Sequence, residues 1–553
     1  MWLAMSLQSS SAAPDALLYF ISAGERLPPG GAAEVGNKAW NLMRMAAAGL
    51  PVPAGFVLPT LWCGARHQPE TGKPAQHRVL GQGINRLERI TGLGFGSLRK
   101  PLLVSVRSGA SISMPGMMET VLDVGVNDET VEGLIRLTGN PRLAWDCYRR
   151  LIQGYAEVVQ GLDTEPFDEL TRQALGIEGL ENEHMLDHRA LQRLVQAMLA
   201  RFRALAATPF PQSPAEQLEQ ATDAVFRSWD APKAAQYRRL NHIGDDIGTA
   251  VTVQAMVFGN AGGTSGSGVG FTRDPATGED DIYIDFQFNG QGEDVVAGRL
   301  ALRDADRLQS TLPAAWDRLN EIRRQLETMF TDVQDFEFTI QNGRLYLLQT
   351  RDAKRTPWAA LKIACDLVEE GLIQPREALR RLRAIDPAEV VRSHLDGTGD
   401  VPLARATVSG IGVVSGRIAF DTEAAKQFAD QGEPAILVRR ETTTADITGM
   451  ANAAGILTSR GGRTSHAAVV ARQLGKVCLV GCAALDIDTA RRSCSIGPGK
   501  FAEGDWLTLD GNAGAVHAGR LDVTLERPDA QLAMIARWRA SEAASPVEPG
   551  PRS

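Results

Sequence analysis

Cysteine is scarce in this sequence, with six in 553 residues. No two cysteines have CxxC spacing, and no paired cysteine and histidine spacing indicates a zinc site. A chain of this length is also no disulfide-stapled miniprotein. We therefore expect a reduced compartment in which most thiols lie in hydrophobic cores.

An excess of basic residues is also missing. The chain has 58 Lys and Arg against 66 Asp and Glu, a net charge of −8. A nucleic-acid-binding protein usually carries a basic footprint, so nucleic acid is not an expected partner. A bound anion would have to meet a local group of cations.

Long apolar runs are absent as well. No uncharged apolar stretch reaches the about 18 residues that a membrane-spanning helix needs. Residues 1–20 have no Lys or Arg ahead of their apolar residues and no continuous apolar core, so they do not resemble a signal peptide. The sequence predicts no membrane helix and a cytoplasmic location.

The length suggests about three or four domains. Apolar residues recur at helical spacing from about residue 130 to 245, which predicts a helical block inserted between strand-rich parts. The sequence predicts a helical and charged stretch over residues 352–395 and a hinge at 394–400. A compact α/β segment covers 403–520, and the Ala/Ser/Pro-rich end should fray.

Several strands are predicted in the first 350 residues. Pro101–Arg107 has a buried-strand pattern, and further strand-like runs cover 249–254, 281–286, 335–340 and 345–349. The last two runs are joined by Gln341-Asn342-Gly343, which predicts a β-hairpin.

The segment around His466 carries the clearest chemical signal. A strand ends in Gly461-Gly462, and His466 then begins an apolar helix that Thr464 or Ser465 can cap. Neutral imidazole is nucleophilic near pH 7, and a phosphate on it would meet the N–H groups at the helix start. His466 could instead only cap or pack the helix, but its flanking residues favour a phosphorylated histidine.

A glycine- and hydroxyl-rich segment lies between two predicted strands. Such a loop can approach phosphates closely, although a flexible hairpin end has the same composition. The candidate phosphate loop consists of Gly262, Gly263, Thr264, Ser265 and Gly266.

Four polar residues alternate along the predicted hairpin. Asp335 and Glu337 share one face of their strand, and Gln349 and Arg351 share one face of the partner strand. Their oxygens suit Mg²⁺, and Arg351 could hold a phosphate. A ladder of cross-strand charge pairs is the alternative interpretation.

Two cations complete the candidate nucleotide site. Lys38 lies at the first predicted helix, and Arg107 ends a strand before a glycine-containing loop. Both could neutralise nucleotide phosphates, although surface or ion-pair roles fit each residue alone equally well.

Taken together, these stretches resemble the pyruvate phosphate dikinase family from about residue 20 to 520. The resemblance covers Leu103–Ala110 with Ser113–Met118, Ala250–Arg273, Gln291–Gly298, Leu348–Arg351 and Gly461–Ala467. It implies an α/β and α+β multidomain protein. Residues 1–350 would form an ATP-grasp-type domain with a helical insertion at about 130–245, and 351–402 a helical linker. Residues 403–520 would form a swivelling phosphohistidine domain, followed by a tail at 521–553.

The resemblance also implies an activity and its residues. His466 would take a phosphoryl group from ATP plus inorganic phosphate, giving AMP and pyrophosphate. Lys38, Arg107, Asp335, Glu337, Gln349 and Arg351 match nucleotide contacts, and Glu337 and Gln349 match the Mg²⁺ ligands. Thr464 matches a position that some members phosphorylate for regulation.

The chain differs from family members in one domain, and this difference determines which partner we expect. Members continue into a barrel that binds pyruvate and phosphoenolpyruvate, whereas the roughly 40 residues after Gly511 cannot build a barrel of about 250 residues. We expect the acceptor, with pyruvate as one candidate, on a separate barrel subunit. Two alternatives stay open: a water-dikinase-type or small-molecule phosphotransferase, and a non-catalytic ATP-binding regulatory protein.

Overall fold

The computed structural model describes residues 18–65, 72–112, 114, 119–180, 182–292, 305–387, 389–395, 401–462 and 465–544. The chain forms two compact units. Unit 1 comprises Met1–Gly262 and Tyr346–Gln349, and unit 2 comprises Gly263–Leu345 and Thr350–Ser553. The division falls inside the stretch 1–350, which the sequence treats as one domain.

Unit 1 is built on a five-stranded antiparallel sheet in the order β1-β2-β7-β5-β6. Its strands are β1 (Tyr19–Ile21), β2 (Gly55–Leu58), β5 (Val104–Gly109), β6 (Thr120–Val124) and β7 (Ala250–Ala255). Helices α1 (Ala32–Ala47), α2 (Leu61–Ala65) and α3 (Gly72–Thr91) accompany it, with a small pair of strands, β3 (Gly94–Phe95) and β4 (Pro101–Leu102).

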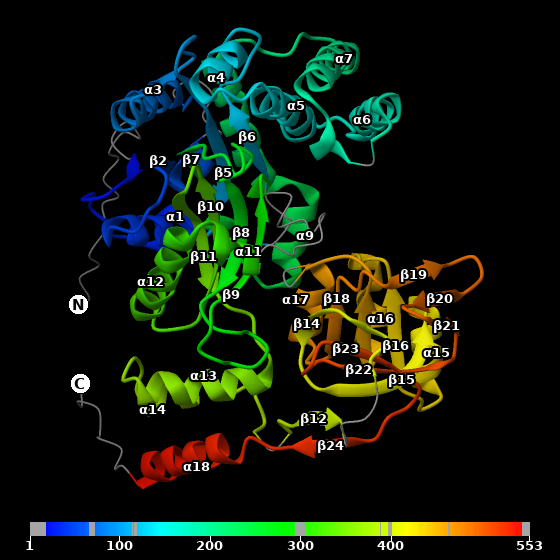
Figure 1. Cartoon of the computed structure of the whole chain (residues 1–553). Coiled ribbons are helices and arrows are strands. Elements are labelled where there is room, and N and C mark those ends of the chain that lie inside the picture. Colours follow the sequence, from blue (N-terminus) through cyan, green and yellow to red (C-terminus); the bar gives the residue numbers. More distant parts are fainter. Residues whose placement is uncertain are drawn as a thin grey trace. The chain divides into compact units, whose positions relative to one another are not determined.

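A helical block lies between β6 and β7 in the chain (Figure 1). Its helices are α4 (Thr130–Thr138), α5 (Pro141–Val158), α6 (Glu165–Glu178), η2 (Glu183–Met185), α7 (His188–Ala206), α8 (Pro214–Arg227), η3 (Ser228–Asp230), α9 (Pro232–Leu240) and η4 (Asp245–Ile247). The apolar faces of α5 and α7 meet, and Tyr155 and Phe202 form an aromatic cluster with Phe210. Helices therefore fill the stretch in which helical spacing was predicted.

Unit 2 opens with a four-stranded sheet in the order β11-β10-β8-β9. The strands are β8 (Gly266–Phe271), β9 (Tyr283–Phe288), β10 (Gln334–Gln341) and β11 (Arg344–Asp352), with α11 (Ala305–Thr311) and α12 (Pro313–Phe330) between β9 and β10. Asn342 and Gly343 join β10 to β11 with φ of 51° and 76°. Two positive φ values are typical of a type I′ turn, so the predicted hairpin is confirmed.

A second part of unit 2 is a helical body. Helices α13 (Pro357–Glu369), α14 (Pro375–Arg381) and α18 (Asp529–Ala544) share a hydrophobic cluster that contains Leu361, Leu367 and Ile535. Two short strands, β12 (Arg392–Leu395) and β24 (Val523–Glu526), pair antiparallel, with Leu395 opposite Val523. The chain thus leaves this body and returns to it through one two-stranded ribbon.

Between those two strands lies a domain with an eight-stranded sheet, which we call the eight-stranded domain (Figure 1). The sheet order is β13-β23-β22-β15-β16-β17-β18-β14, and β15 to β18 are parallel neighbours. The bounds are β13 (Ala404–Arg405), β14 (Thr407–Gly410), β15 (Val413–Ala419), β16 (Ala435–Arg439), β17 (Gly455–Thr458), β18 (Val477–Val480), β22 (Trp506–Asp510) and β23 (Ala515–Ala518).

Helices cover one face of this sheet, and a small sheet packs against the other. Alanines of α15 (Thr422–Asp430) and α17 (His466–Gln473) share a buried cluster with Met450 of α16 (Ile447–Asn452), which follows η5 (Thr444–Asp446). Leu485 and Ile496 come from the three-stranded sheet β19 (Leu485–Asp488), β20 (Ser493–Ile496) and β21 (Gly499–Ala502). Short alanine side chains let the helices lie close to the strands.

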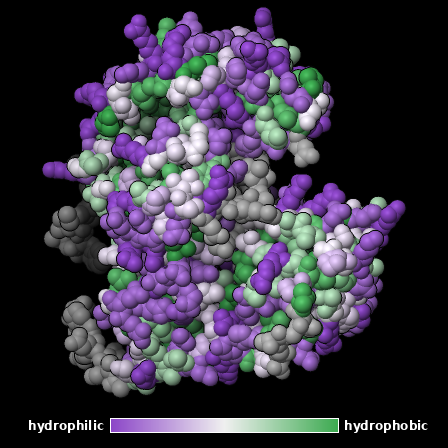
Figure 2. All heavy atoms as spheres, viewed as in Figure 1, coloured by the Kyte–Doolittle hydropathy of each residue, from purple (hydrophilic) through white to green (hydrophobic). Residues whose placement is uncertain are grey.

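Surface and core follow the expectations from composition. All six cysteines are buried and unpaired, as expected for core thiols. In the described part of the chain, no helix combines the length and apolar content that a membrane crossing requires. On the face seen in Figure 2, hydrophobic residues are interspersed among hydrophilic ones.

Candidate active site

His466 is the first residue of α17. The preceding Ser465 accepts a hydrogen bond at Oγ from the Ala468 N–H (3.5 Å), so Ser465 is the N-cap, one of the two caps that the sequence allowed. Gly461 turns the chain with φ of 102°, and Ser465 N–H donates to the Gly462 carbonyl. His466 is half-buried rather than enclosed.

The His466 ring has a partner that sequence inspection missed. The Thr442 hydroxyl lies 3.1 Å from His466 Nδ1, and Thr442 is buried. If Nδ1–H donates to Thr442, Nε2 carries the lone pair that a nucleophile needs. In that tautomer, the contact with Thr442 leaves Nε2 as the ring nitrogen with a free lone pair.

The fold explains how a residue 24 positions upstream reaches the histidine. Thr442 follows β16 and His466 follows β17, and loops after adjacent parallel strands meet at the same edge of a sheet. Asp446 shapes the first loop by accepting from Thr443 N–H (2.8 Å) and by pairing with Arg439 (3.2 Å). No short motif signals this contact, because it depends on strand order.

Thr464, the candidate regulatory residue, lies outside the described residues. Its neighbour Arg463 also lies outside them.

In unit 1 the structure brings the Lys38 and Arg107 segments together. Gly36 interrupts α1 with φ of 77°, and a Cβ there would lie 2.1 Å from the Gly109 carbonyl oxygen. Asn37 N–H donates to the Ala110 carbonyl (3.0 Å), and its side-chain amide donates to the Ser111 carbonyl. The loop after Arg107 is therefore fastened beside Lys38.

Gln349 belongs to the same unit as these cations. Arg107 donates to the Leu348 carbonyl at 3.5 Å, one residue before Gln349. Lys38 is exposed, and Arg107 and Gln349 are half-buried. Two of the predicted nucleotide contacts, Arg107 and Gln349, thus lie on adjoining segments.

Asp335, Glu337 and Arg351 belong to unit 2. Arg351 Nε donates to Asp335 Oδ2 at 2.8 Å, a cross-strand pair of the kind considered as the alternative. Burial raises the pKa of the Asp335 carboxyl, and the Arg351 guanidinium opposes that rise. Glu337 is half-buried two residues further along β10. Of the four polar residues predicted on the hairpin, Asp335 and Arg351 form this ion pair, whereas Glu337 and Gln349 are not part of it.

The candidate phosphate loop divides into two parts. Ser265 is buried, and its Oγ accepts from Asn342 N–H at 2.9 Å. Gly266 is part of β8, where a Cβ would meet the Phe286 ring at 2.2 Å. These two residues serve the fold, while Gly263 and Thr264 are exposed and Gly262 is half-buried.

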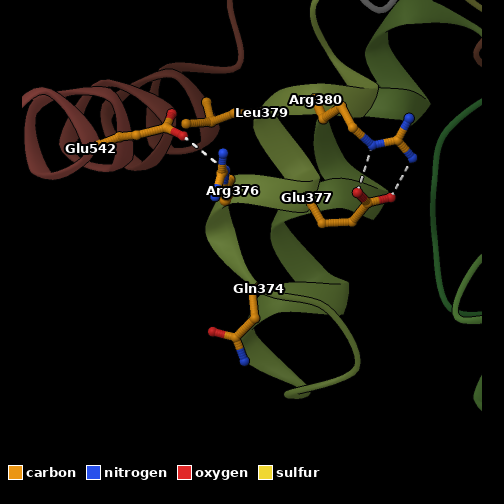
Figure 3. Close-up of a pocket in the computed structure, with 6 residues that line it drawn as sticks. All are labelled: Gln374, Arg376, Glu377, Leu379, Arg380 and Glu542. Atoms are coloured by element: carbon orange, nitrogen blue, oxygen red, sulfur yellow. Dashed lines mark hydrogen bonds and ion pairs between the residues drawn. The ribbon is translucent and has the colours of Figure 1, made fainter. Parts of the chain in front are cut away.

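The structure also contains a cavity of about 690 Å³ between α14 and α18 (Figure 3). Its cations are paired: Arg380 with Glu377 at 2.7 Å, and Arg376 with Glu542 at 3.6 Å. Of the described residues that the sequence singles out, none lines it.

Two family matches cover much of the chain. Residues 82–307 match the pyruvate phosphate dikinase AMP/ATP-binding domain, and residues 431–514 match the mobile domain of PEP-utilising enzymes. The second match contains His466 and Thr442. The first contains Arg107 and the glycine-rich segment.

Curated relatives extend the similarity over 91% of the chain. Pyruvate, phosphate dikinases from Clostridium symbiosum and Rhizobium meliloti are each 42% identical to it, and a chloroplastic one from Zea mays is 40% identical. The chain spans 58%, 58% and 54% of these relatives, a little over half their length. The chain is therefore similar to pyruvate, phosphate dikinases over 91% of its length, including the segment that matches their AMP/ATP-binding domain and the segment that matches the mobile domain of PEP-utilising enzymes.

Proposed function

We propose that the chain is a kinase that phosphorylates its own His466, using ATP and inorganic phosphate and releasing AMP and pyrophosphate. The observation that carries this proposal is the His466 environment. The ring is half-exposed at the start of α17, and Thr442 engages Nδ1, so Nε2 is available as the nucleophile. The N-terminus of α17 also stabilises negative charge on an attached phosphate.

ATP would bind in an ATP-grasp-type domain formed by the first 350 residues. Lys38 and Arg107 would neutralise phosphates, and Gly262, Gly263 and Thr264 would approach them through backbone N–H groups. Arg351 would orient Asp335 and contribute positive charge near the nucleotide. These assignments follow the family resemblance and the fastening of the loop after Arg107.

Mg²⁺ is the metal that this site suits. The described residues contain no group of three or more His, Cys, Asp or Glu positioned to hold an ion. Mg²⁺ bound with a nucleotide does not need such a group, because it takes one or two carboxylates plus phosphates and water. Glu337 and Gln349 would supply the protein oxygens, and the ion would neutralise developing charge on the phosphates.

The phosphoryl group would then pass to another acceptor. The eight-stranded domain would swivel at the ribbon formed by β12 and β24 and deliver phosphohistidine to a barrel that binds pyruvate. We place that barrel on a separate subunit and the protein in the cytoplasm. Phosphorylation of Thr464 would be a means of regulation, because a charged group two residues before His466 would repel a nucleotide phosphate.

The test is incorporation of label from [β-³²P]ATP with Mg²⁺ and inorganic phosphate. We expect acid-labile label in the wild type, none in His466→Ala, and normal labelling in His188→Gln, which changes an exposed histidine of α7. Release of AMP should require phosphate rather than water alone. Label that persists in His466→Ala, or ATP binding by the wild type without AMP release, would reject the proposal.

A further inference from the structure

Asn260 is a buried polar residue directly before the glycines of the candidate phosphate loop. Only 4% of its surface is exposed. Its side-chain N–H₂ donates to Asp146 Oδ2 at 3.4 Å. Its backbone carbonyl oxygen accepts from the Asn140 side-chain amide, also at 3.4 Å. Both partners belong to α5 or its N-cap, within the helical block.

The two partners are themselves held firmly. Asn140 is the N-cap of α5, and its Oδ1 accepts from the Leu143 N–H at 3.0 Å. Asp146 is buried and pairs with Arg149 at 3.0 Å and with Arg150 at 3.1 Å. Burial opposes ionisation of Asp146, but the surrounding guanidinium groups hold its pKa well below its ordinary value. Asn260 therefore contacts a fixed, charged carboxylate.

The chain beyond Asn260 is fastened again only a few residues later. Thr264 O accepts from Gly343 N–H, and Ser265 Oγ accepts from Asn342 N–H, both at 2.9 Å. Between these anchors, a Cβ at Gly262 or at Gly263 would meet no atom of the described residues within 4 Å. The loop is thus open at its tip and held at both ends.

The chemistry of Asn260 favours a positioning role over a purely stabilising one. Within the described part of the chain, its Oδ1 is buried without a hydrogen-bond partner. A buried acceptor without a donor costs free energy, and the same side chain also donates to the fixed carboxylate of Asp146. The Asn260 side-chain amide holds the backbone at this position next to α5, because it donates to Asp146 of that helix.

We propose that Asn260 is a positioning residue that fixes the near end of the phosphate loop, so that the N–H groups of Gly262 to Thr264 face the triphosphate of the nucleotide. Through it, the helical block determines how tightly ATP is held. This inference depends on the proposed function, because it requires that the loop contact phosphates.

The experiment compares Asn260→Ala and Asn140→Ser with a matched control, Tyr155→Phe. Serine keeps the oxygen that caps α5 but loses the amide that donates to Asn260. Tyr155→Phe removes a hydrogen bond to Gln220 from the same helix, away from the loop. The rate of His466 labelling is measured in single turnovers against ATP concentration, together with amide hydrogen exchange of residues 259–266.

We expect the ATP concentration for half-maximal labelling to rise about three- to tenfold in both test variants, which corresponds to about 0.7–1.4 kcal/mol. The maximal rate should stay within about twofold, as expected when ground-state binding alone is weakened. Exchange in 259–266 should increase in the test variants and stay unchanged in Tyr155→Phe.

An unchanged ATP dependence in Asn260→Ala, or an equal shift in Tyr155→Phe, would overturn the inference. A wild type that neither binds ATP nor labels His466 would instead reject the proposed function. The two failures are therefore distinguishable, because one appears only in the variants and the other already in the unmodified protein.

Discussion

Replacing Thr442 by valine should slow phosphorylation of His466 without unfolding the domain. Valine keeps the shape of threonine but removes the hydroxyl that lies 3.1 Å from Nδ1. When Nε2 attacks phosphorus, the ring gains positive charge, so the Nδ1–H bond to Thr442 becomes charge-assisted. Such bonds contribute about 1.5–3 kcal/mol, which corresponds to a rate about 12- to 150-fold lower.

The assay is rapid-quench labelling of His466 from [β-³²P]ATP at saturating nucleotide. Thr442→Ser retains a hydroxyl and should remain within about threefold of the wild type, since the hydrogen bond can still form. Thermal unfolding of both variants controls for loss of structure. Wild-type labelling by a folded Thr442→Val protein would refute the argument that this hydroxyl selects the reactive nitrogen.

Two further perturbations test the framework of unit 1. Gly36→Ala should destabilise the protein in urea by about 1–3 kcal/mol, because its Cβ would lie 2.1 Å from the Gly109 oxygen. Gly49→Ala, with a similar φ of 78° and no atom of the described part of the chain within 4 Å of its Cβ, measures the backbone strain alone, and equal effects would contradict the clash. Asp146→Asn should cost about 3–5 kcal/mol at pH 7. Because the pKa of Asp146 is lowered in the folded state, its contribution is present at neutral pH and is lost as pH falls below about 4. Urea unfolding at pH 7 and pH 3 should therefore show a smaller deficit at pH 3, and a deficit independent of pH would argue against the charged state.

The sequence predicts features whose determinants are local. Asn342-Gly343 gives the turn of the β10–β11 hairpin because both positions adopt positive φ, and Ser465 caps α17 because it directly precedes the helix. Asp335 and Arg351 are harder to interpret. Period-two alternation places each on a known face, but only the paired strands show that they bind each other.

Features that depend on topology escape sequence inspection. Thr442 reaches His466 only because β16 and β17 are parallel neighbours, a pairing that no local pattern encodes. The glycine-rich sequence of β8 resembles that of a phosphate loop. However, a Cβ added at Gly266, Gly268 or Gly270 would lie only about 2.2–2.6 Å from an atom of a phenylalanine ring. The same residue type serves a loop and a crowded strand, and only neighbours in space distinguish the two uses.

The chain enters and leaves the eight-stranded domain through the ribbon of β12 and β24, so this domain is a single insertion, called the cassette below, which also contacts Tyr283 of β9 through its Val408 carbonyl. Leu395 and Val523 stand opposite each other in adjacent strands, so the excised ends could be rejoined by a short turn. The helices on either side, α13 and α14 before the ribbon and α18 after it, share one core that does not include the cassette. Grafting a different histidine-bearing domain onto these two ends would preserve that core, which offers a direct way to exchange the part of the protein that contains His466.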